Sequence, residues 1–382
     1  MTSKIHSIVF ISGQLGLGGA EKQLYLLIKS LIKQGFEITV IDFYPLQHGY
    51  WRGPIQALGV NLISYEFRSK PRRIIELTKD LIRIKPQIVH SWNFFTNPYA
   101  NICGKIAGIP LRVGSVREHP NYWTKPVTLR LLSNLGLSGL IFNSQNAYLA
   151  YKKKFARFLN PIHPKIFVIQ NGIEIPAPEN RKTLQESLNA YGVYFPEDEY
   201  LIKIIGVGRL NLNKNWSMLI QACNELKRRH INFFTLIIGE GPERGNLRRQ
   251  IDQYHLSSHI LLPGQIPNAA QYLPLFDLLC SCSNSEGIPN VIMEAASRGV
   301  PVLATDVGGT SELINPSTSG LLVKRSDIDG FINKLIYLYE NPEIRKKLGV
   351  NGQQSMRDNF SIEKMVNGFL HAYQELSANS LN

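Results

Sequence analysis

Short apolar runs alternate with amphipathic segments along nearly the whole chain. The stretch Glu21–Gln34 has the period of a helix and ends at Gly35, a residue typical of helix ends. Apolar runs bounded by turn residues predict strands KIHSIVFIS (4–12), EITVIDFY (37–44), QIVHSW (87–92), LRVGSV (111–116), SGLIFNS (138–144) and KIFVIQNG (165–172). Continuous apolar strands that alternate with helices indicate a parallel sheet covered on both faces.

A second series follows residues 173–200, a connection rich in Pro, Glu and Asn that has room for one short helix. Its predicted elements are strands 201–209, 233–241, 259–266, 277–283 and 301–306, and helices at Trp216–Arg229, Arg244–Tyr254 and from Pro289 onward. We therefore expect an α/β protein with two doubly wound parallel-sheet domains, residues 1–170 and 171–360. Ligands of such sheets bind where strands reach their carboxyl ends, and the cleft between two domains is the natural site.

The segment SEGIPNVIMEAASRG (285–299) places Glu286 and Glu294 eight residues apart at the start of a predicted helix. Pro289 suits the first turn of that helix, and Gly299 its left-handed cap. A helix start of this kind is an anion site, suited to a diphosphate, with main-chain amides supplied by Gly287, Ile288, Asn290 and Val291. Glu294 would then reach two ribose hydroxyls, and Glu286 a hexose. Helix-dipole stabilisation of about 0.3–1 kcal/mol explains either glutamate alone, but not the whole arrangement.

Two cations follow the first strand of the second series. GVGRLNLNKN (206–215) delivers Arg209 and Lys214 to the expected edge of the sheet, where they could neutralise a leaving diphosphate. An exposed Arg and Lys after a strand are individually common, so the motif is weak by itself.

A glycine loop joins the first strand to the first helix, in ISGQLGLGGAEK (11–22). A dinucleotide site is the competing interpretation, but the third glycine position of G-x-G-x-x-G is occupied by Glu21. We interpret Gly18 and Gly19 as permitting close approach of the main chain to the donor, with NAD binding as the alternative.

Two histidines end predicted strands of the first domain. His90 closes QIVHSW, and His119 lies in SVREHPNYW beside Arg117 and Glu118. A single histidine is more often structural than functional, and of these two His119 is the better candidate for catalysis.

Charge is distributed unevenly along the 382 residues, whose formal net charge is +13. Residues 1–160 hold 21 Lys and Arg against 7 Asp and Glu, whereas the remainder holds 21 against 22. The basic clusters Arg68–Arg73 and Tyr151–Arg157 indicate an anionic partner, which could be a phospholipid surface, a phosphorylated acceptor or nucleic acid. A merely solvated basic surface is the plain alternative.

Other features of the sequence indicate where the protein acts and which cofactors it lacks. The apolar runs are strand-sized and the N-terminus has no secretory cleavage site, so we expect a cytoplasmic protein. The four cysteines do not form a disulfide framework, and Cys280 and Cys282 are expected to be buried free thiols rather than metal ligands. No D-x-D pair follows a strand at a plausible site, so no essential metal and no separate cofactor are expected.

Taken together, 286–312, 206–215, IGEGPERGNL (238–247), QNGIE (170–174) and GLGGAEK (16–22) resemble the family 4 glycosyltransferases. These are retaining enzymes with the GT-B fold of two facing Rossmann-like domains. The resemblance implies that Glu286 contacts the donor sugar and Glu294 the ribose, and that Arg209 and Lys214 hold the diphosphate while Gly18 closes on it.

The resemblance also implies that His119 is the active-site histidine and that the base lies near Ile266. It further implies that a C-terminal helix, expected at 361–377 within the segment 361–382, packs back on the first domain. Two positions depart from the family pattern. Asn215 stands where glycine is usual, and Glu174 where aspartate is common.

We therefore expect a retaining, metal-independent glycosyltransferase. It would move a hexose from a nucleoside-diphosphate sugar, UDP more readily than GDP, to a lipid-linked saccharide in polysaccharide or lipopolysaccharide synthesis. Peripheral association with the inner face of the membrane would use the two basic clusters. The alternatives are a nucleotide-sugar epimerase or soluble sugar-phosphate glycosyltransferase on the same fold and, from another class, a basic nucleic-acid-binding module.

Overall fold

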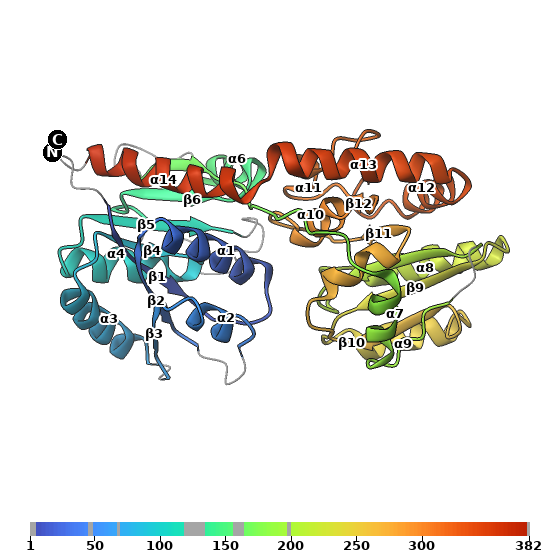
Figure 1. Cartoon of the computed structure of the whole chain (residues 1–382), viewed down its shortest axis with the longest axis horizontal. Helices are drawn as coiled ribbons and strands as arrows, with labels where there is room; N and C mark the ends of the chain where they lie inside the picture. The colour runs from blue at the N-terminus through green and yellow to red at the C-terminus, as the bar shows by residue number, and fades with distance from the viewer. Residues whose placement is uncertain are drawn as a thin grey trace. The chain divides into compact units, whose positions relative to one another are not determined.

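A computed structural model describes residues 5–44, 49–66, 69–117, 134–155, 164–196 and 200–379. The chain divides into two compact units, each with its own parallel sheet (Figure 1). The first unit comprises Met1–Gly172 and Ile362–Asn382, and the second comprises Ile173–Ser361. The expected boundaries at residues 170 and 360 lie within two residues of these divisions, and the C-terminal helix belongs to the first unit.

The sheet of the first unit has seven strands in the order β3-β2-β1-β4-β5-β6-β7, and all of its pairings are parallel. The strands are β1 (Ser7–Ser12), β2 (Glu37–Asp42), β3 (Asn61–Ser64), β4 (Ile88–Ser91), β5 (Leu111–Val116), β6 (Gly139–Phe142) and β7 (Lys165–Val168). The strand order reverses between β1 and β4, which is the topological switch point where ligands of doubly wound sheets bind.

Helices cover both faces of this sheet. The helices of the first unit are α1 (Gly19–Lys33), α2 (Arg52–Gln56), α3 (Lys70–Ile84), η1 (Phe94–Thr96), α4 (Asn97–Ile106), α6 (Gln145–Phe155) and α14 (Ile362–Asn379). Successive strand residues point to opposite faces of the sheet, so each face has its own core. Helices α1, α2 and α14 pack on one face, and α3, α4 and α6 pack on the other. The expected C-terminal helix is therefore present and packs on α1.

The second unit has six parallel strands in the order β10-β9-β8-β11-β12-β13. They are β8 (Ile202–Val207), β9 (Phe233–Ile238), β10 (Ile260–Gly264), β11 (Leu278–Ser281), β12 (Val302–Thr305) and β13 (Leu321–Val323). The helices are α7 (Arg181–Asn189), α8 (Trp216–Arg228), α9 (Arg244–Gln253), η4 (Ala269–Leu275), α10 (Asn290–Ser297), α11 (Thr310–Leu313), α12 (Ile328–Glu340) and α13 (Pro342–Asn359). The switch point of this sheet lies between β8 and β11. The predicted fold class is thus confirmed in both units.

His90, next to the last residue of β4, belongs to a buried polar cluster that links α14 to the first sheet. Its Nδ1 lies 2.7 Å from the Tyr373 hydroxyl oxygen and its Nε2 lies 2.8 Å from Oγ of Ser115. Burial lowers the pKa of His90 well below its usual value, so the ring is neutral in the folded protein. Lys165 and Glu375 add an ion pair between β7 and α14. His90 therefore has a structural role, as a single histidine of this kind usually does.

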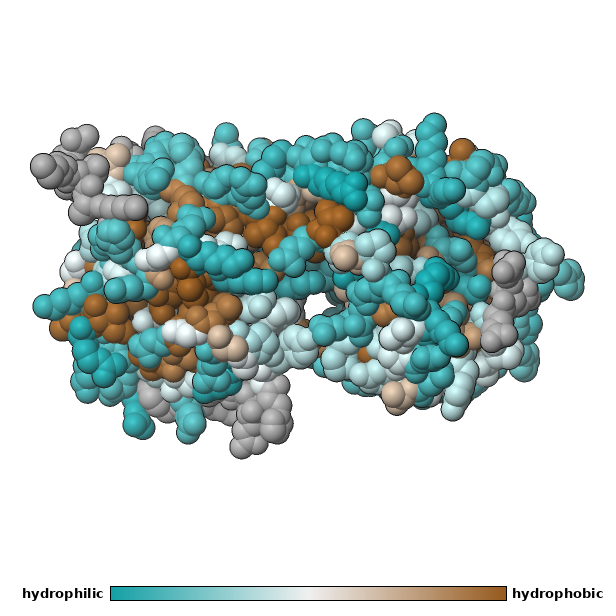
Figure 2. All heavy atoms as spheres, in the orientation of Figure 1, coloured by the Kyte–Doolittle hydropathy of each residue, from teal (hydrophilic) through white to brown (hydrophobic). Residues whose placement is uncertain are grey.

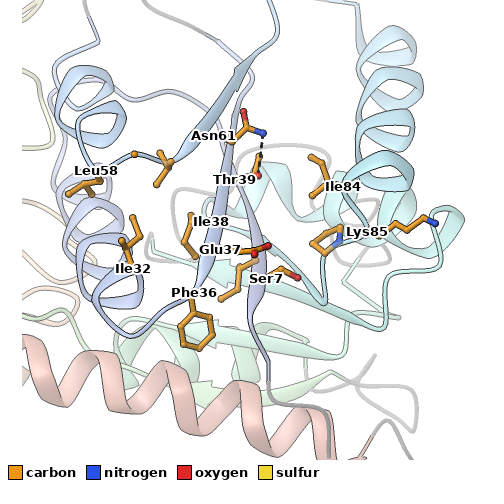
Figure 3. Close-up of a pocket in the computed structure, with 14 residues that line it drawn as sticks. Ser7, Ile32, Phe36, Glu37, Ile38, Thr39, Leu58, Asn61, Ile84 and Lys85 are labelled. Carbon is orange, nitrogen blue, oxygen red and sulfur yellow. Dashed lines mark hydrogen bonds between the residues drawn. The ribbon is translucent and has the colours of Figure 1, made fainter.

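A groove of about 590 Å³ opens at the amino ends of β1 to β4 (Figure 3). Apolar side chains such as Ile38, Leu58 and Ile84 line it, together with Glu37 and Lys85. It lies at the opposite edge of the first sheet from the switch point of that sheet.

The outer surface is mainly hydrophilic on the face displayed in Figure 2, with apolar side chains reaching the surface in several places. Within the described part of the chain, no helix combines the length and apolar character that a bilayer span requires.

The neutral state of His90 predicts a pH dependence of stability. The unfolded chain takes up a proton near pH 6.5 and the folded one does not, so the free energy of unfolding decreases as the pH falls below about 6.5. This one group contributes at most about 1.4 kcal/mol per pH unit. Asp42 acts in the opposite sense, because burial raises its pKa from 3.8 to about 6.

Urea unfolding of the wild type and of His90→Gln, over about pH 7.5 to 5.5, isolates the histidine contribution. The difference in free energy of unfolding between the two proteins should shrink as the pH falls. Parallel pH profiles would contradict a neutral, buried His90.

Candidate functional site

The loops that follow β8 and β11 meet at the switch point of the second sheet. Nζ of Lys214, after β8, donates to Oε1 of Glu286, after β11, over 2.5 Å. Three further hydrogen bonds join the loops. The Asn213 side-chain amide donates to Ser285 O and that of Asn284 to Leu212 O, each over 2.9 Å, and the Asn284 main-chain N–H donates to Asn213 O over 2.7 Å. The structure thus brings together two predicted site residues, and it pairs them directly with each other.

Glu286 is fixed from both the main chain and the side chain. Its Oε1 accepts a second hydrogen bond from Ser283 Oγ, over 2.6 Å. The glycine loop after β12 lies against its main chain: a Cβ on Gly308, which has φ of +56°, would stand 1.8 Å from Glu286 O. The side chain of Glu286 is 13% exposed and that of Lys214 is 22% exposed, so both charges are partly shielded from water. The carboxylate is held in a defined orientation at the sheet edge.

The loop that carries Arg209 and Lys214 is anchored by Trp216, the first residue of α8. The Trp216 indole N–H donates to Arg209 O over 3.2 Å, and its ring lies where a Cβ on Gly206 would stand. Arg209 itself is exposed. Asn215 has a φ of +49°, a left-handed conformation that asparagine adopts more readily than most residues other than glycine. This conformation explains why the residue after the lysine is asparagine where the family usually has glycine.

Helix α10 begins one residue later than the sequence indicated. Pro289 is extended, with φ of −75° and ψ of 101°, and precedes the helix as its N-cap rather than forming its first turn. Gly299 adopts the predicted left-handed conformation, with φ of +73°. Glu294 lies one turn inside the helix and is partly buried. Among the described residues, no hydrogen bond within the protein uses the main-chain N–H groups of Gly287, Ile288 and Val291.

These amides, with that of Asn290, form the start of α10 where the predicted anion site lies. The side chain of Ile288 is buried in the core, so only its main chain is available to a ligand.

Ile266 follows β10 at the same edge of the sheet. Its side chain is 2% exposed and packs in the core, so a ligand base could meet only its main chain. Nearby, Arg244 donates to Leu262 O over 2.8 Å and to Glu240 over 3.2 Å. The place predicted for the base is therefore bordered by an Arg–Glu pair to which the sequence motifs assigned no role.

The glycine loop of the first unit lies at the switch point of its own sheet. Gly18 is the N-cap of α1 and Gly19 its first residue. The Glu21 carboxylate lies close to the loop: a Cβ on Gly18 would stand 2.1 Å from Glu21 Oε2. The indole N–H of Trp92, after β4, donates to Ala20 O over 2.7 Å. The loop thus leads directly into α1 and is held by contacts within the first unit.

His119 lies outside the described residues, so its predicted role remains a prediction. Arg117, two residues earlier, lies within the described residues, and the sequence indicated no role for it beyond its position beside His119. Its guanidinium lies 3.3 Å from the centre of the Trp92 ring and donates to Asn171 Oδ1 over 3.2 Å. Burial lowers the pKa of Arg117 to about 9, so it stays charged at neutral pH. Its contacts hold the end of β5, from which the His119 segment departs.

Two further expectations concern cysteines and metals. All four cysteines are buried free thiols, as predicted for Cys280 and Cys282, and burial raises the pKa of each of these two. Within the described residues, no group of three or more His, Cys, Asp or Glu side chains is arranged to hold a metal ion.

Two family models match the chain. One, described as glycosyl transferases group 1, covers residues 195–355, and the other, described as glycosyltransferase family 4, covers residues 17–175. The protein belongs to the family 4 glycosyltransferases, which have the GT-B fold. This confirms the resemblance on which the expected roles of Glu286 and Glu294 rest.

Two curated relatives match over nearly their whole length, and a third matches over about two fifths of its length. The chain is 24% identical to the lipopolysaccharide core biosynthesis glycosyltransferase LpsD of Rhizobium meliloti, covering 93% of this chain and 95% of LpsD. It is 26% identical to a Campylobacter jejuni α-1,4-N-acetyl-D-galactosaminyltransferase, named for a PP-undecaprenol-linked saccharide, covering 97% and 98%. A third match, 29% identical to N-acetyl-α-D-glucosaminyl L-malate synthase of Bacillus anthracis, covers 38% of this chain and 39% of that enzyme.

Solved structures share the fold. HepE of Anabaena, solved in complex with UDP-glucose, superposes with a TM-score of 0.81 at 18% identity, covering 97% of this chain and 99% of HepE. Sucrose-phosphate synthase of Thermosynechococcus elongatus gives a TM-score of 0.76 at 18% identity, covering 98% and 100%.

The close approach of Gly308 to Glu286 yields a prediction for Gly308→Ala. A left-handed backbone costs an alanine about 1–2 kcal/mol, and the added Cβ would also displace Glu286 O. We expect a lower melting temperature and weaker nucleotide-sugar binding, measured by differential scanning calorimetry and titration calorimetry.

Gly245→Ala is the matched control, because its Cβ would meet nothing within 4 Å and alanine favours a helix. It should leave binding unchanged. Equal behaviour of the two variants would show that the Gly308 contact does not shape the site.

Proposed function

We propose that this family 4 glycosyltransferase moves a hexose from a nucleoside-diphosphate sugar to a lipid-linked saccharide, with retention of anomeric configuration and without an essential metal. UDP is favoured over GDP as the carrier. The observation that carries the proposal is the meeting of Lys214 and Glu286 at the switch point of the second sheet, beside the start of α10. This arrangement supplies a cation, a carboxylate and main-chain amides at one edge.

Each group has a distinct task in the proposed donor site. The amides at the start of α10 and the cations Arg209 and Lys214 would stabilise charge on the diphosphate. Glu294 would accept hydrogen bonds from ribose hydroxyls, and Glu286 from the hexose. The base would lie against the main chain near Ile266, since that side chain is buried.

The chemical step needs one bond broken and one formed. The bond from the anomeric carbon to the β-phosphate oxygen breaks, and a bond from that carbon to the acceptor oxygen forms on the same face. The acceptor proton passes to the departing phosphate oxygen. Electrostatic stabilisation of that oxygen by a preorganised cation typically contributes about 2.7–4 kcal/mol per donor. A trapped glycosyl-enzyme adduct would contradict this route.

Names of similar proteins support the choice of donor and acceptor. HepE structures contain UDP and UDP-glucose, and a Staphylococcus aureus TarM variant was solved with UDP and α-GlcNAc-glycerol. LpsD is named for lipopolysaccharide core synthesis, and the Campylobacter enzyme for a PP-undecaprenol-linked saccharide. We extend these to a role for this chain in cell-surface polysaccharide synthesis, on the cytoplasmic face of a membrane.

Contact with an anionic membrane would use the first unit, although one predicted cation is excluded. Arg73 is 1% exposed, and its guanidinium stacks 4.0 Å from the Tyr44 ring centre, so it cannot face lipid. Arg68 and Arg157 lie outside the described residues. The exposed cations that remain are Lys70, Arg72, Lys152, Lys153 and Lys154.

Helices α3 and α6, which carry these cations, and α4 cover the same face of the sheet and also expose apolar side chains. Ile75 and Ile82 of α3 are 53% and 50% exposed, Ile102 and Ile106 of α4 are 44% and 62% exposed, and Leu149 of α6 is 52% exposed. Apolar side chains among cations suit the interface of an anionic bilayer.

Thermal stabilisation by a ligand panel tests the donor proposal. The panel contains UDP, GDP, ADP, NAD, UDP-glucose and GDP-mannose, and a ligand at about 100 times its dissociation constant should add roughly 2.7 kcal/mol. We expect stabilisation by UDP and UDP-glucose that is lost in Glu294→Ala and kept in Glu343→Ala, an exposed control in α13. Stabilisation by NAD alone would overturn the donor site.

Vesicle binding tests the membrane proposal. At about 1 kcal/mol per cation, replacing Lys152, Lys153 and Lys154 with glutamine should weaken low-salt binding to phosphatidylserine vesicles on the order of a hundredfold. The control replaces exposed lysines of the second unit, Lys182, Lys346 and Lys347. Equal loss in both triple variants, or none in either, would remove the α6 lysines from any docking surface.

A further inference from the structure

Two buried hydroxyl groups stand behind Glu286. Ser283 is 1% exposed, and its Oγ donates to Glu286 Oε1 over 2.6 Å. Thr305 is 2% exposed, and its Oγ1 donates to the Ser283 carbonyl oxygen over 2.6 Å. The hydroxyl of Thr305 therefore holds the main chain of Ser283, and the hydroxyl of Ser283 holds the carboxylate.

The hydrogen bonds that Glu286 accepts involve only one of its two carboxylate oxygens. Lys214 and Ser283 both contact Oε1, whereas Oε2 has no hydrogen-bond partner within the described residues. A carboxylate with one oxygen fixed by two donors loses most of its rotational freedom. Its second oxygen then points in one direction before any ligand arrives, which lowers the entropy cost of binding.

The sheet determines where this arrangement can form. Thr305 is the last residue of β12, and β11 leads to Ser283; the two strands are neighbours, with Ser281 paired to Ala304. A hydroxyl at the end of β12 can therefore reach the carbonyl two residues beyond β11. Because Lys214 comes from the loop after β8, on the other side of β11, the carboxylate is held from both neighbouring strands.

We propose that Ser283 and Thr305 are positioning residues that preset the Glu286 carboxylate, so that Oε2 faces the hexose of the donor. The proposal rests on the proposed function, in which Glu286 contacts the sugar. It predicts that loss of either hydroxyl weakens binding of the sugar. Binding of the nucleoside diphosphate should not change, because Glu286 does not contact that part of the donor in the proposed site.

The test compares binding of UDP and UDP-glucose by titration calorimetry. In Ser283→Ala and Thr305→Val, the affinity for UDP should stay within about twofold of the wild type, and the affinity for UDP-glucose should fall at least about tenfold. Thr305→Ser, which keeps the hydroxyl, should restore the wild-type ratio. Thr235→Val is the matched control, because Thr235 is a fully buried residue of β9 whose hydroxyl lies 3.4 Å from Cys223 Sγ on α8.

Equal loss of both ligands would indicate a packing role and overturn the proposal, as would an unchanged ratio in both variants. A second measurement does not depend on the donor. Crystal structures of the wild type and Ser283→Ala should show the Glu286 carboxylate in different orientations, and an unmoved carboxylate would overturn the positioning role. If the wild type binds neither UDP nor UDP-glucose, the choice of donor fails, and the crystal structures still decide the positioning role.

Discussion

The contact between Lys214 and Glu286 is the interaction on which the candidate site depends. It exists because β11 lies beside β8 although 70 residues separate the end of one from the start of the other, which a doubly wound sheet requires at its switch point. Removing one member of a partly buried pair leaves an uncompensated charge, so each residue constrains the other. The pairing does not prevent Lys214 from meeting a phosphate, because an ammonium group has three donors and Glu286 occupies one.

Glycines make the surrounding loops close enough for this contact. A Cβ on Gly239 would stand 1.9 Å from Gly208 O, and one on Gly308 would stand 1.8 Å from Glu286 O. The loop after β9 is therefore packed main chain against main chain on the loop after β8, and the loop after β12 on the loop after β11, where side chains would keep them apart. Close packing thus explains why glycine stands at positions 239 and 308, and the charged side chains of these loops lie at the edge of the sheet.

Local sequence patterns predicted the elements that carry the site and missed those that support it. The strands that end at Arg209 and Glu286 are continuous apolar runs, and their type is readable without tertiary information. Helix α3 was not among the predicted elements, although Leu77 and Leu81 recur at helical spacing on its inward face, together with Arg73. Strand β13 has three residues, too few for a pattern.

Side-chain pairing at the site was also beyond local reasoning. The sequence placed Lys214 on phosphate and Glu286 on sugar, but it gave no sign that they contact each other, because that contact joins segments 72 residues apart. Ser283 was read only as the end of a strand. Its hydroxyl matters because it donates to Glu286, three residues later. Residue spacing alone does not predict the turn geometry that makes this contact possible.

The formal charge of the first unit overstates the electrostatic field at its surface, because some of its cations lie inside the unit. Arg73 and Arg117 both stack on aromatic rings inside the unit, at 4.0 Å from Tyr44 and 3.3 Å from Trp92 respectively. Their charges stabilise packing and contribute little to an approaching anion, which senses exposed cations within about one Debye length. The anion would instead sense exposed cations, among them the three consecutive lysines of α6. With about 1 kcal/mol from each, binding to an anionic surface would be weak and reversible, as suits an enzyme that must release its product.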